Sequence, residues 1–368
     1  MIILGVSFGT VISWIGYVLV ALLCLMAMIV IHELGHYVAG KMFHFTITEF
    51  SIGFGPAIFR RNIRRTGEAF SIRCIPLGGF CAFEGEDENS HNEGDFNSKP
   101  VWQRIIVLGM GAMFNYLSAL LIVSIFFMSY GELVPQVVRV YPFHDDACVQ
   151  LLEEGDVILS VNNEPTYSLL EANKFQQLLA DKEEVVLTIE RDGQQRDLTV
   201  RKGEYTYAVE DENGEIKTYD SVGFGISVGY AKRKLPFFSA IGHGFEFGLD
   251  LVRFTFRAIG SVFTGKASVG DTLGGTVTAI HSLATLSSQG FAAVMYGLCV
   301  LSMSLAMFNI LPIPALDGAR ILFCVIEGIF NKPINRRVEG AIHTVGLVVL
   351  FGLAILLDIV HFFKLGGA

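Results

Sequence analysis

Apolar and polar positions along the chain form several distinct patterns, which predict different environments. A helix needs about 20 mostly apolar residues to cross a bilayer. Four stretches meet this requirement: residues 11–39, and three that begin at Val101, Gly290 and Ala341. The apolar pattern therefore predicts a polytopic α-helical membrane protein with four transmembrane helices.

The segment between the second and third apolar runs is more polar and has a shorter period. Its short runs rich in Val, Ile and Thr, bounded by turn residues, predict strands. Residues 168–180 have apolar positions at helical spacing and predict a helix. The acidic residues 209–220 predict an exposed loop, so the segment as a whole predicts a small mixed α+β domain. The predicted strands are residues 135–140, 156–163, 184–191 and 194–200.

Residues 236–263 have an amphipathic pattern. Polar side chains recur every three or four positions and form one stripe along a helix, while aromatic and aliphatic residues occupy the other faces. We expect this helix to lie in the membrane interface. The alternative is a tilted fifth span, which would place the last loop on the wrong side of the membrane. The stripe consists of His243, Glu246, Asp250, Arg253 and Arg257.

The loop after the first apolar run predicts a hairpin. Residues 50–83 alternate between apolar and polar positions, and Gly, Pro and a basic turn punctuate them. A loop this apolar is expected to dip back toward the membrane, where the helices shield it from lipid.

Basic residues orient the predicted helices. Lys and Arg concentrate in the loop between the first two spans and in the loop between the last two, and they mark the cytoplasmic side of short loops. We therefore expect both loops in the cytoplasm and the mixed α+β domain outside it. The first apolar run lacks a basic leader and an obvious cleavage site, which indicates a retained helix.

The composition agrees with a membrane protein and restricts its partners. The chain of 368 residues is 52% hydrophobic and 17% charged, which is too apolar for an ordinary soluble globule. Its net charge of -9 argues against a nucleic-acid partner, which would favour a basic face. The cysteines form no CxxC pair, so they predict neither a disulfide framework nor a cysteine zinc site.

The first apolar run ends in a cluster of titratable residues, HELGH. His32 and His36 are four residues apart and share one face of a helix, where two imidazoles can bind one Zn2+. Glu33 can act as general base on a zinc-bound water, whose pKa falls to about 7. Titratable groups in a membrane helix are costly and therefore indicate function. The alternative is a set of polar residues that reach toward the interface.

A catalytic zinc needs a third protein ligand, and Asp317 is the favoured candidate. It follows the third apolar run, where Pro312 and Pro314 end the helix and free the chain to turn an acid inward. The charge pattern places HELGH and Asp317 at the same membrane face. His44 is the nearest rival among the other histidines, and an Asp-Gly turn without a metal is the alternative for Asp317.

These motifs resemble the site-2 protease family, in particular its bacterial intramembrane zinc metalloproteases with a PDZ domain. The resemblance covers nearly the whole chain: HELGH, NILPIPALDG after the third span, EFSIGFGP and IPLGGF of a membrane-reentrant β-hairpin, and LLEEGDVILSVNN of a PDZ core. It implies zinc on His32, His36 and Asp317, with Glu33 as the base and Asn309 as a substrate-binding residue. Residues 111–115, Gly-Ala-Met-Phe-Asn, depart from the family, which has Gly-Pro before this Asn.

The resemblance also implies a substrate and a location. The expected activity is hydrolysis of peptide bonds in transmembrane segments of single-pass membrane proteins, such as anti-sigma factors or remnant signal peptides. We expect a multi-pass protein of the bacterial cytoplasmic (inner) membrane, with an extracytoplasmic PDZ domain and an active site near the cytoplasmic face. The expected partners are these substrates and the lipid bilayer, with no nucleic acid.

Two other functions and one division of the chain complete the predictions. A membrane-anchored zincin that cuts soluble segments, and a non-catalytic PDZ scaffold, are the alternatives. The expected division is residues 1–130 for the N-terminal membrane core, 131–230 for the PDZ domain, 231–270 for the interfacial helix and 271–368 for the C-terminal membrane core.

Overall fold

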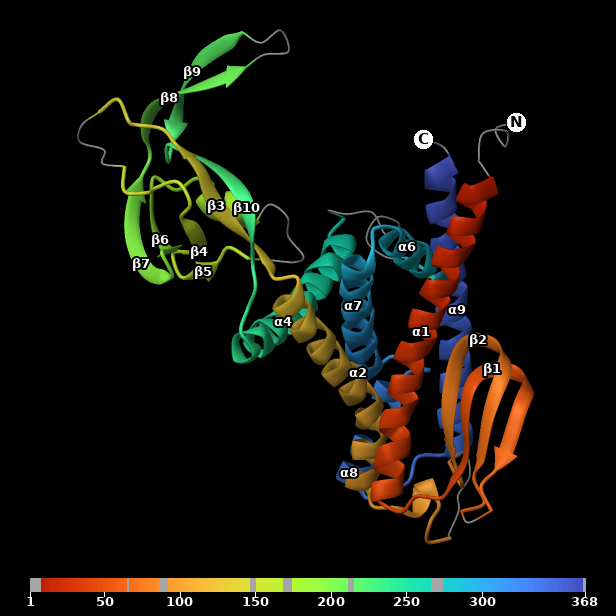
Figure 1. The fold of residues 1–368 in the computed structure, drawn as a ribbon. Coiled ribbons are helices and arrows are strands. Elements are labelled where there is room, and N and C mark those ends of the chain that lie inside the picture. Colours follow the sequence, from red (N-terminus) through yellow and green to blue (C-terminus); the bar gives the residue numbers. More distant parts are fainter. Residues whose placement is uncertain are drawn as a thin grey trace. The chain divides into compact units, whose positions relative to one another are not determined.

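The computed structural model describes residues 8–64, 66–86, 92–145, 150–167, 174–210, 215–265 and 274–366 (Figure 1). The chain divides into two compact units. The first consists of Met1–Val123 and Gly244–Ala368, and the second consists of Ser124–His243.

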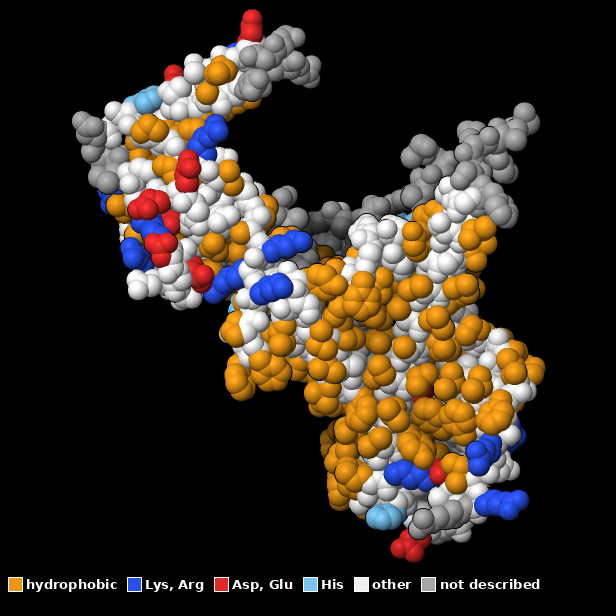
Figure 2. Space-filling view, in the orientation of Figure 1, with side chains coloured by type: hydrophobic (Ala, Val, Ile, Leu, Met, Phe, Trp, Pro, Cys, Tyr) orange, Lys and Arg blue, Asp and Glu red, His pale blue; other side chains and the backbone are white. Residues whose placement is uncertain are grey.

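Four helices are long and apolar enough to cross a membrane, by their length and composition. Hydrophobic side chains cover much of the surface of the first unit (Figure 2), as expected where lipid replaces water. The prediction of four apolar membrane helices is therefore confirmed. Among the described residues, the amphipathic helix α4 (Phe237–Phe263) does not belong to this set. The four helices are α1 (Phe8–Met42), α2 (Val101–Ser129), α7 (Phe291–Ile310) and α9 (Arg336–Gly366).

The predicted hairpin is present in the first unit as β1 (Ile47–Asn62) and β2 (Ala69–Phe83). Each strand is irregular and contributes two paired segments. Residues 69–72 of β2 pair with 59–62 and also with 49–52, and residues 49–52 pair in turn with 79–82. The segment near the end of β2 therefore lies at one edge of this small sheet, and β2 runs beside α1 (Figure 1).

The second unit is built on a six-stranded antiparallel sheet of order β10-β3-β4-β6-β7, with β5 paired to β4. Its core is aliphatic, and Ile158, Leu187 and Ile189 are at most 1% exposed. Arg191 forms two bonds of 2.7 Å to the buried carboxylate of Asp156, which compensates that buried charge. The elements are β3 (Glu132–Val140), β4 (Val157–Val161), β5 (Glu164–Pro165), α3 (Lys174–Leu179), β6 (Glu184–Arg191), β7 (Gln194–Arg201) and β10 (Ile226–Arg233).

Val209 and residues 215–220 are exposed, as expected, but the expected loop is wrong at both ends of the segment 209–220, which are strands. β8 (Gly203–Glu210) and β9 (Ile216–Gly223) form a separate antiparallel pair. Tyr207 stacks on the opposite Tyr219 with ring centroids 5.7 Å apart, and such cross-strand aromatic pairs stabilise a hairpin in spite of its acidic composition. Residues 211–214, and residues 168–173 of the predicted helix, lie outside the described part of the chain.

Three further helical segments of the first unit were not predicted. They are η1 (Phe96–Ser98), α6 (Thr276–Ser288) and α8 (Asp317–Phe330). The start of α6 is held by Asp358 of α9, whose carboxylate accepts hydrogen bonds from the backbone N–H groups of Val277 and Thr278 at 3.0 and 2.9 Å. A distant residue of α9 thus provides the cap that the residues before α6 do not supply.

Candidate metal centre

Three side chains from distant parts of the chain converge between α1 and the start of α8. Nε2 of His32 lies 3.0 Å from Oδ2 of Asp317, and Nε2 of His36 lies 3.2 Å from the same oxygen. The two Nε2 atoms are 3.1 Å apart. Among the described residues, this is the one group of three His, Cys, Asp or Glu side chains placed to share a metal ion.

The donor atoms of this cluster fit zinc. A tetrahedral zinc with ligand bonds of about 2.0–2.1 Å holds its donor atoms about 3.3 Å apart. The observed separations of 3.0–3.2 Å are close to that spacing. Two imidazoles and one carboxylate also leave a fourth position open, which is the arrangement of catalytic rather than structural zinc sites.

Glycines allow α1 and α2 to approach closely at the histidines. A Cβ on Gly35, within HELGH, would lie 2.2 Å from the backbone oxygen of Met110. A Cβ on Gly111 would lie 2.4 Å from Nε2 of His36 and 2.7 Å from Cε1 of His32. Neither helix has room for a larger residue at these points, so the two glycines set the helix separation at the cluster.

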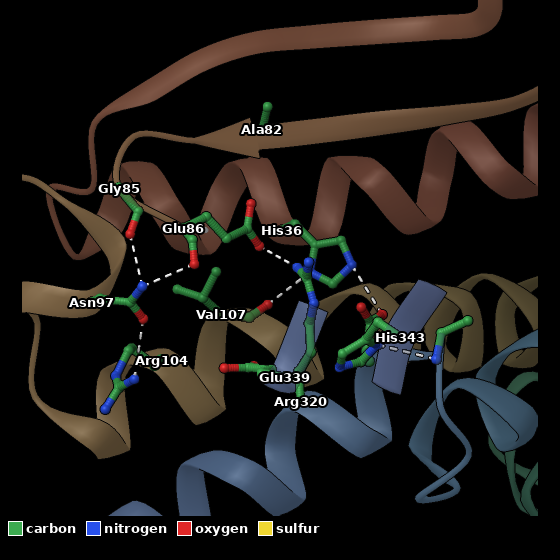
Figure 3. Close-up of polar contacts among 12 residues, drawn as sticks. His36, Ala82, Gly85, Glu86, Asn97, Arg104, Val107, Arg320, Glu339 and His343 are labelled. Carbon is green, nitrogen blue, oxygen red and sulfur yellow. Dashed lines mark hydrogen bonds and ion pairs between the residues drawn. The ribbon is translucent and has the colours of Figure 1, made fainter. Parts of the chain in front are cut away.

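The second ring nitrogen of His36 has a defined partner. Nδ1 of His36 lies 2.8 Å from the backbone oxygen of Val107 (Figure 3), and because a carbonyl can only accept, Nδ1 carries the proton. This leaves the lone pair of Nε2 directed at the cluster, as a metal ligand requires. The corresponding nitrogen of His32, Nδ1, lies 3.5 Å from Nδ2 of Asn115 on α2.

A short loop places Asp317 opposite the histidines. α7 ends at Ile310, and the chain then passes through Ala315, which adopts the left-handed backbone region with φ 79°. The N–H of Ala315 donates to Nδ1 of His343 at 3.0 Å, which anchors this loop to α9. Gly318 completes the turn, because a Cβ there would lie 2.3 Å from the backbone oxygen of Ile310.

The surroundings of Asp317 keep its carboxyl ionised. Burial alone would raise the pKa of this group, but when His36 is protonated on both ring nitrogens its charge, together with hydrogen bonds from His32 and His36, outweighs burial and lowers the pKa of Asp317. A carboxylate is the form that can bind a metal ion.

Glu33 lies beside the cluster at a cavity of about 480 Å³. Glu33, His36 and Asp317 all line this cavity, and residues 80–83 of β2 line another part of its wall. The backbone N–H of Cys81 faces the Glu33 carboxylate. The cavity therefore joins the metal cluster, a carboxylate and a strand edge in one space.

Two other residues named from the sequence lie apart from the cluster. Asn309 is in the last turn of α7, where its Nδ2 donates to the backbone oxygen of Leu305 at 2.9 Å, and it is not among the described residues that line the cavity. His44 is exposed beyond the end of α1 and does not join the cluster.

Sequence reasoning missed the charged wall of the cavity. Glu86 pairs with Arg320 of α8 at the cavity (Figure 3). Glu327 of α8 bonds at 2.7 Å to both Arg104 of α2 and Arg336 of α9. These acids and bases are far apart in sequence and follow no motif; the one available signal is an Arg or Glu inside an apolar helical run.

The family match and the most similar relatives of this chain point to the same family of proteins. Residues 20–353 match the family described as Peptidase family M50. "Putative zinc metalloprotease CPE1693" of Clostridium perfringens is 32% identical over 344 residues, which cover 93% of this chain and 97% of that protein. Similarly named proteins of Fusobacterium nucleatum and Nostoc are 29% and 28% identical, and the matches cover 94% and 92% of this chain and 98% and 94% of those proteins.

Proposed function

Because the chain belongs to Peptidase family M50, the site-2 protease family, and is a membrane-embedded zinc metalloprotease, we propose that it hydrolyses peptide bonds in transmembrane segments of single-pass membrane proteins. The observation that carries this proposal is the position of the cluster of His32, His36 and Asp317. The two histidines belong to α1, and Asp317 follows α7, so the cluster lies between helices of the membrane-spanning set. A substrate segment that lies in the same bilayer can reach such a centre without leaving it.

The residues of the centre have distinct proposed roles. His32, His36 and Asp317 would hold the zinc, which when bound would supply a Lewis acid for the scissile carbonyl and for a water molecule. Glu33 removes a proton from the attacking water and then delivers it to the leaving amine, so each turnover returns Glu33 to its starting state. The N–H of Cys81, which faces the Glu33 carboxylate, is proposed to orient it during both transfers.

The substrate is proposed to bind as an added strand, because a helix hides the peptide groups that must be attacked. Residues 79–82 of β2 pair on one side with 49–52, and residues 80–83 line the cavity. The second side of this segment can therefore bond to an extended peptide and hold it next to the cluster. Asn309 is proposed as a further contact to that peptide.

This role requires the β1–β2 hairpin to enter the membrane as a reentrant element. Exposed apolar side chains on β1 support such a position: Ile58 is 73% exposed, and Phe54 and Phe59 are 44% and 49% exposed. In water this much exposed apolar surface would be unfavourable, whereas in the bilayer it would face lipid.

The second unit is proposed to be a PDZ domain on the extracytoplasmic side of a bacterial inner membrane. Its six-stranded sheet and short α3 support the assignment to a PDZ domain. The basic residues in the loop between α1 and α2 and in the loop between α7 and α9 support its position outside the cytoplasm. In the proposed division the PDZ domain covers residues 131–230, and α4 lies in the interface within residues 231–270. The two flanking membrane cores, 1–130 and 271–368, then hold the active site near the cytoplasmic face. The PDZ domain would exclude substrates that keep bulky outer domains, such as anti-sigma factors before they are shortened.

The test is cleavage of a reporter protein by the purified full chain in detergent. The reporter carries a single transmembrane segment, and a matched reporter carries the same number of cleavable bonds in a soluble linker. Wild type should cut only within the transmembrane segment, and Glu33→Gln should bind zinc equally well but lose cleavage by at least about 1,000-fold. Equal cleavage by wild type and Glu33→Gln would refute the assigned chemistry.

The matched reporter separates this proposal from the soluble-segment alternative. Cleavage confined to the soluble linker would show that the enzyme acts outside the bilayer and would overturn the substrate class. Mass spectrometry of the products locates the cut in either case.

A further inference from the structure

Asn115 stands out among the residues that the proposed mechanism does not use. It is fully buried on α2. Its Nδ2 lies 3.5 Å from Nδ1 of His32, and its Oδ1 has no hydrogen-bond partner among the described residues. A buried amide oxygen without a partner costs about 1–3 kcal/mol, so the orientation of this side chain needs an explanation.

The tautomer of His32 supplies one. Nε2 of His32 faces Asp317 and His36, so when this nitrogen binds a metal the ring proton must sit on Nδ1. Nδ1 then donates, and the amide Nδ2 that faces it also donates, so the two cannot bond. A half-turn of the Asn115 amide exchanges its oxygen and nitrogen, which have nearly the same shape. That turn gives both Nδ1 of His32 and Oδ1 of Asn115 a partner.

The two histidines of the cluster then have equivalent environments. His36 already donates its Nδ1 proton to the backbone oxygen of Val107 on α2. With the amide turned, His32 donates its Nδ1 proton to the same helix, two turns farther on. Groups that accept from the outer nitrogen of a metal-binding histidine fix its tautomer and orientation.

The surroundings of Asn115 fix the rotation of α2 at this point. Oγ of Ser302 on α7 donates to the backbone oxygen of Asn115 at 2.8 Å, and Oγ of Ser118 also approaches that oxygen at 2.9 Å. Gly111, one turn earlier, leaves space for both imidazoles. The same face of α2 therefore both admits the histidines and presents the amide to one of them.

We propose that Asn115 is a positioning residue for the zinc site, whose Oδ1 accepts the Nδ1 proton of His32 and so holds His32 in its metal-binding tautomer. This inference rests on the proposed role of His32 as a ligand. It adds a residue of α2 to the determinants of zinc affinity, and it gives the Asn of residues 111–115 a chemical role.

The test measures zinc binding rather than cleavage. The purified full chain in detergent is titrated with zinc against a chelator of known affinity, and the cobalt-substituted protein is examined by visible absorption. Asn115→Asp retains an acceptor of nearly the same shape, and Asn115→Leu retains the size without an acceptor. Cys299→Ala is the matched control, because it removes a buried contact between α7 and α2, from Sγ of Cys299 to the backbone oxygen of Ala119, that involves neither Asn115 nor His32.

The expected results differ between the variants. Asn115→Leu should weaken zinc binding about 10–100-fold and shift the cobalt absorption bands. Asn115→Asp should bind zinc as tightly as wild type or more tightly, and Cys299→Ala should leave zinc affinity and the cobalt spectrum unchanged. Zinc affinity of Asn115→Asp reduced tenfold or more would overturn the proposal, since it would show that the amide nitrogen or simple packing is what matters. This arm remains decisive if Asn115→Leu does not fold.

His32→Ala distinguishes failure of this inference from failure of the proposed ligand set. If His32→Ala loses zinc and Asn115→Leu does not, the ligand assignment stands and only the role of Asn115 is refuted. If His32→Ala binds zinc as wild type does, the ligand set itself is wrong.

Discussion

Replacing Gly111 with Ala should disrupt the metal centre without removing any of its ligands. The new Cβ would lie 2.4 Å from Nε2 of His36 and 2.7 Å from Cε1 of His32. Non-bonded heavy atoms are comfortable at about 3.5 Å or more, so the imidazoles or α2 must move by about 1 Å. Functional groups need to be held within about 0.5 Å of their working positions. The required movement of about 1 Å is about twice that tolerance. Both affected side chains belong to the cluster, so the movement would disturb the metal ligands directly.

The expected loss of zinc affinity is therefore larger than the loss caused by changing a residue that only supports a ligand. Changes to groups that merely support a ligand cost about 10–100-fold in metal affinity, so we expect Gly111→Ala to weaken zinc binding at least about 100-fold. The overpacked contact between α1 and α2 should also lower stability by about 1–3 kcal/mol. Chelator competition measures the affinity, elemental analysis measures the zinc content, and thermal unfolding in detergent measures the stability.

Gly109→Ala is the matched control on the same helix. A Cβ at position 109 meets nothing within 4 Å, whereas both substitutions give the same gain in helix propensity of about 1 kcal/mol. Gly109→Ala should therefore keep its zinc and be as stable as wild type or slightly more so. If Gly111→Ala binds zinc within about threefold of Gly109→Ala, α1 and α2 do not approach as closely as the steric argument requires, and the argument fails.

Three further outcomes follow from other contacts. Glu327→Gln should destabilise the protein by about 3–5 kcal/mol in thermal unfolding, because it leaves the buried guanidinium group of Arg104 without a counter-charge, whereas Arg336 keeps its ion pair with Glu339; Arg253→Ala, at an exposed ion pair, should cost under about 1 kcal/mol. Asp358→Ala should speed amide hydrogen exchange at the start of α6 by about 5–30-fold, the equivalent of losing a cap worth about 1–2 kcal/mol; unchanged exchange would contradict this capping role. Removal of zinc by a chelator should abolish proteolysis and added zinc should restore it, and activity that persists in zinc-free enzyme would contradict the catalytic role of the metal.

The membrane helices and four of the eight described strands of the second unit, β3, β4, β6 and β7, were predictable because their patterns are local. α2 and α7 begin at or next to the residues that the apolar runs indicated, and β6 coincides with the predicted run at 184–191. β8 and β9 were missed because their acidic sequence lacks the aliphatic alternation of a half-buried strand. Their pairing depends instead on cross-strand tyrosines, a feature that is visible only once the register is known.

The candidate site divides in the same way between local and non-local information. His32 and His36 could be paired from their spacing alone, and Asp317 could be joined to them from the distribution of charge, which assigns both segments to one membrane face. The backbone oxygen of Val107 could not be predicted, because every residue offers such an acceptor and only the packing of α2 on α1 selects this one. The ion pairs of Glu327 are equally non-local, since they join three helices.

Three glycines connect the local motifs with the non-local packing around them. HELGH is usually read for its two histidines and its acid, but Gly35 determines how close α2 can come to the histidines. Gly111 provides the same clearance from the other side, and Gly318 lets the chain turn tightly enough to bring Asp317 to them. A larger side chain at any of the three would leave every proposed ligand in the sequence and still separate them in space. A sequence search for this kind of metal centre should therefore require the glycine beside each motif as well as the residues that bind the metal.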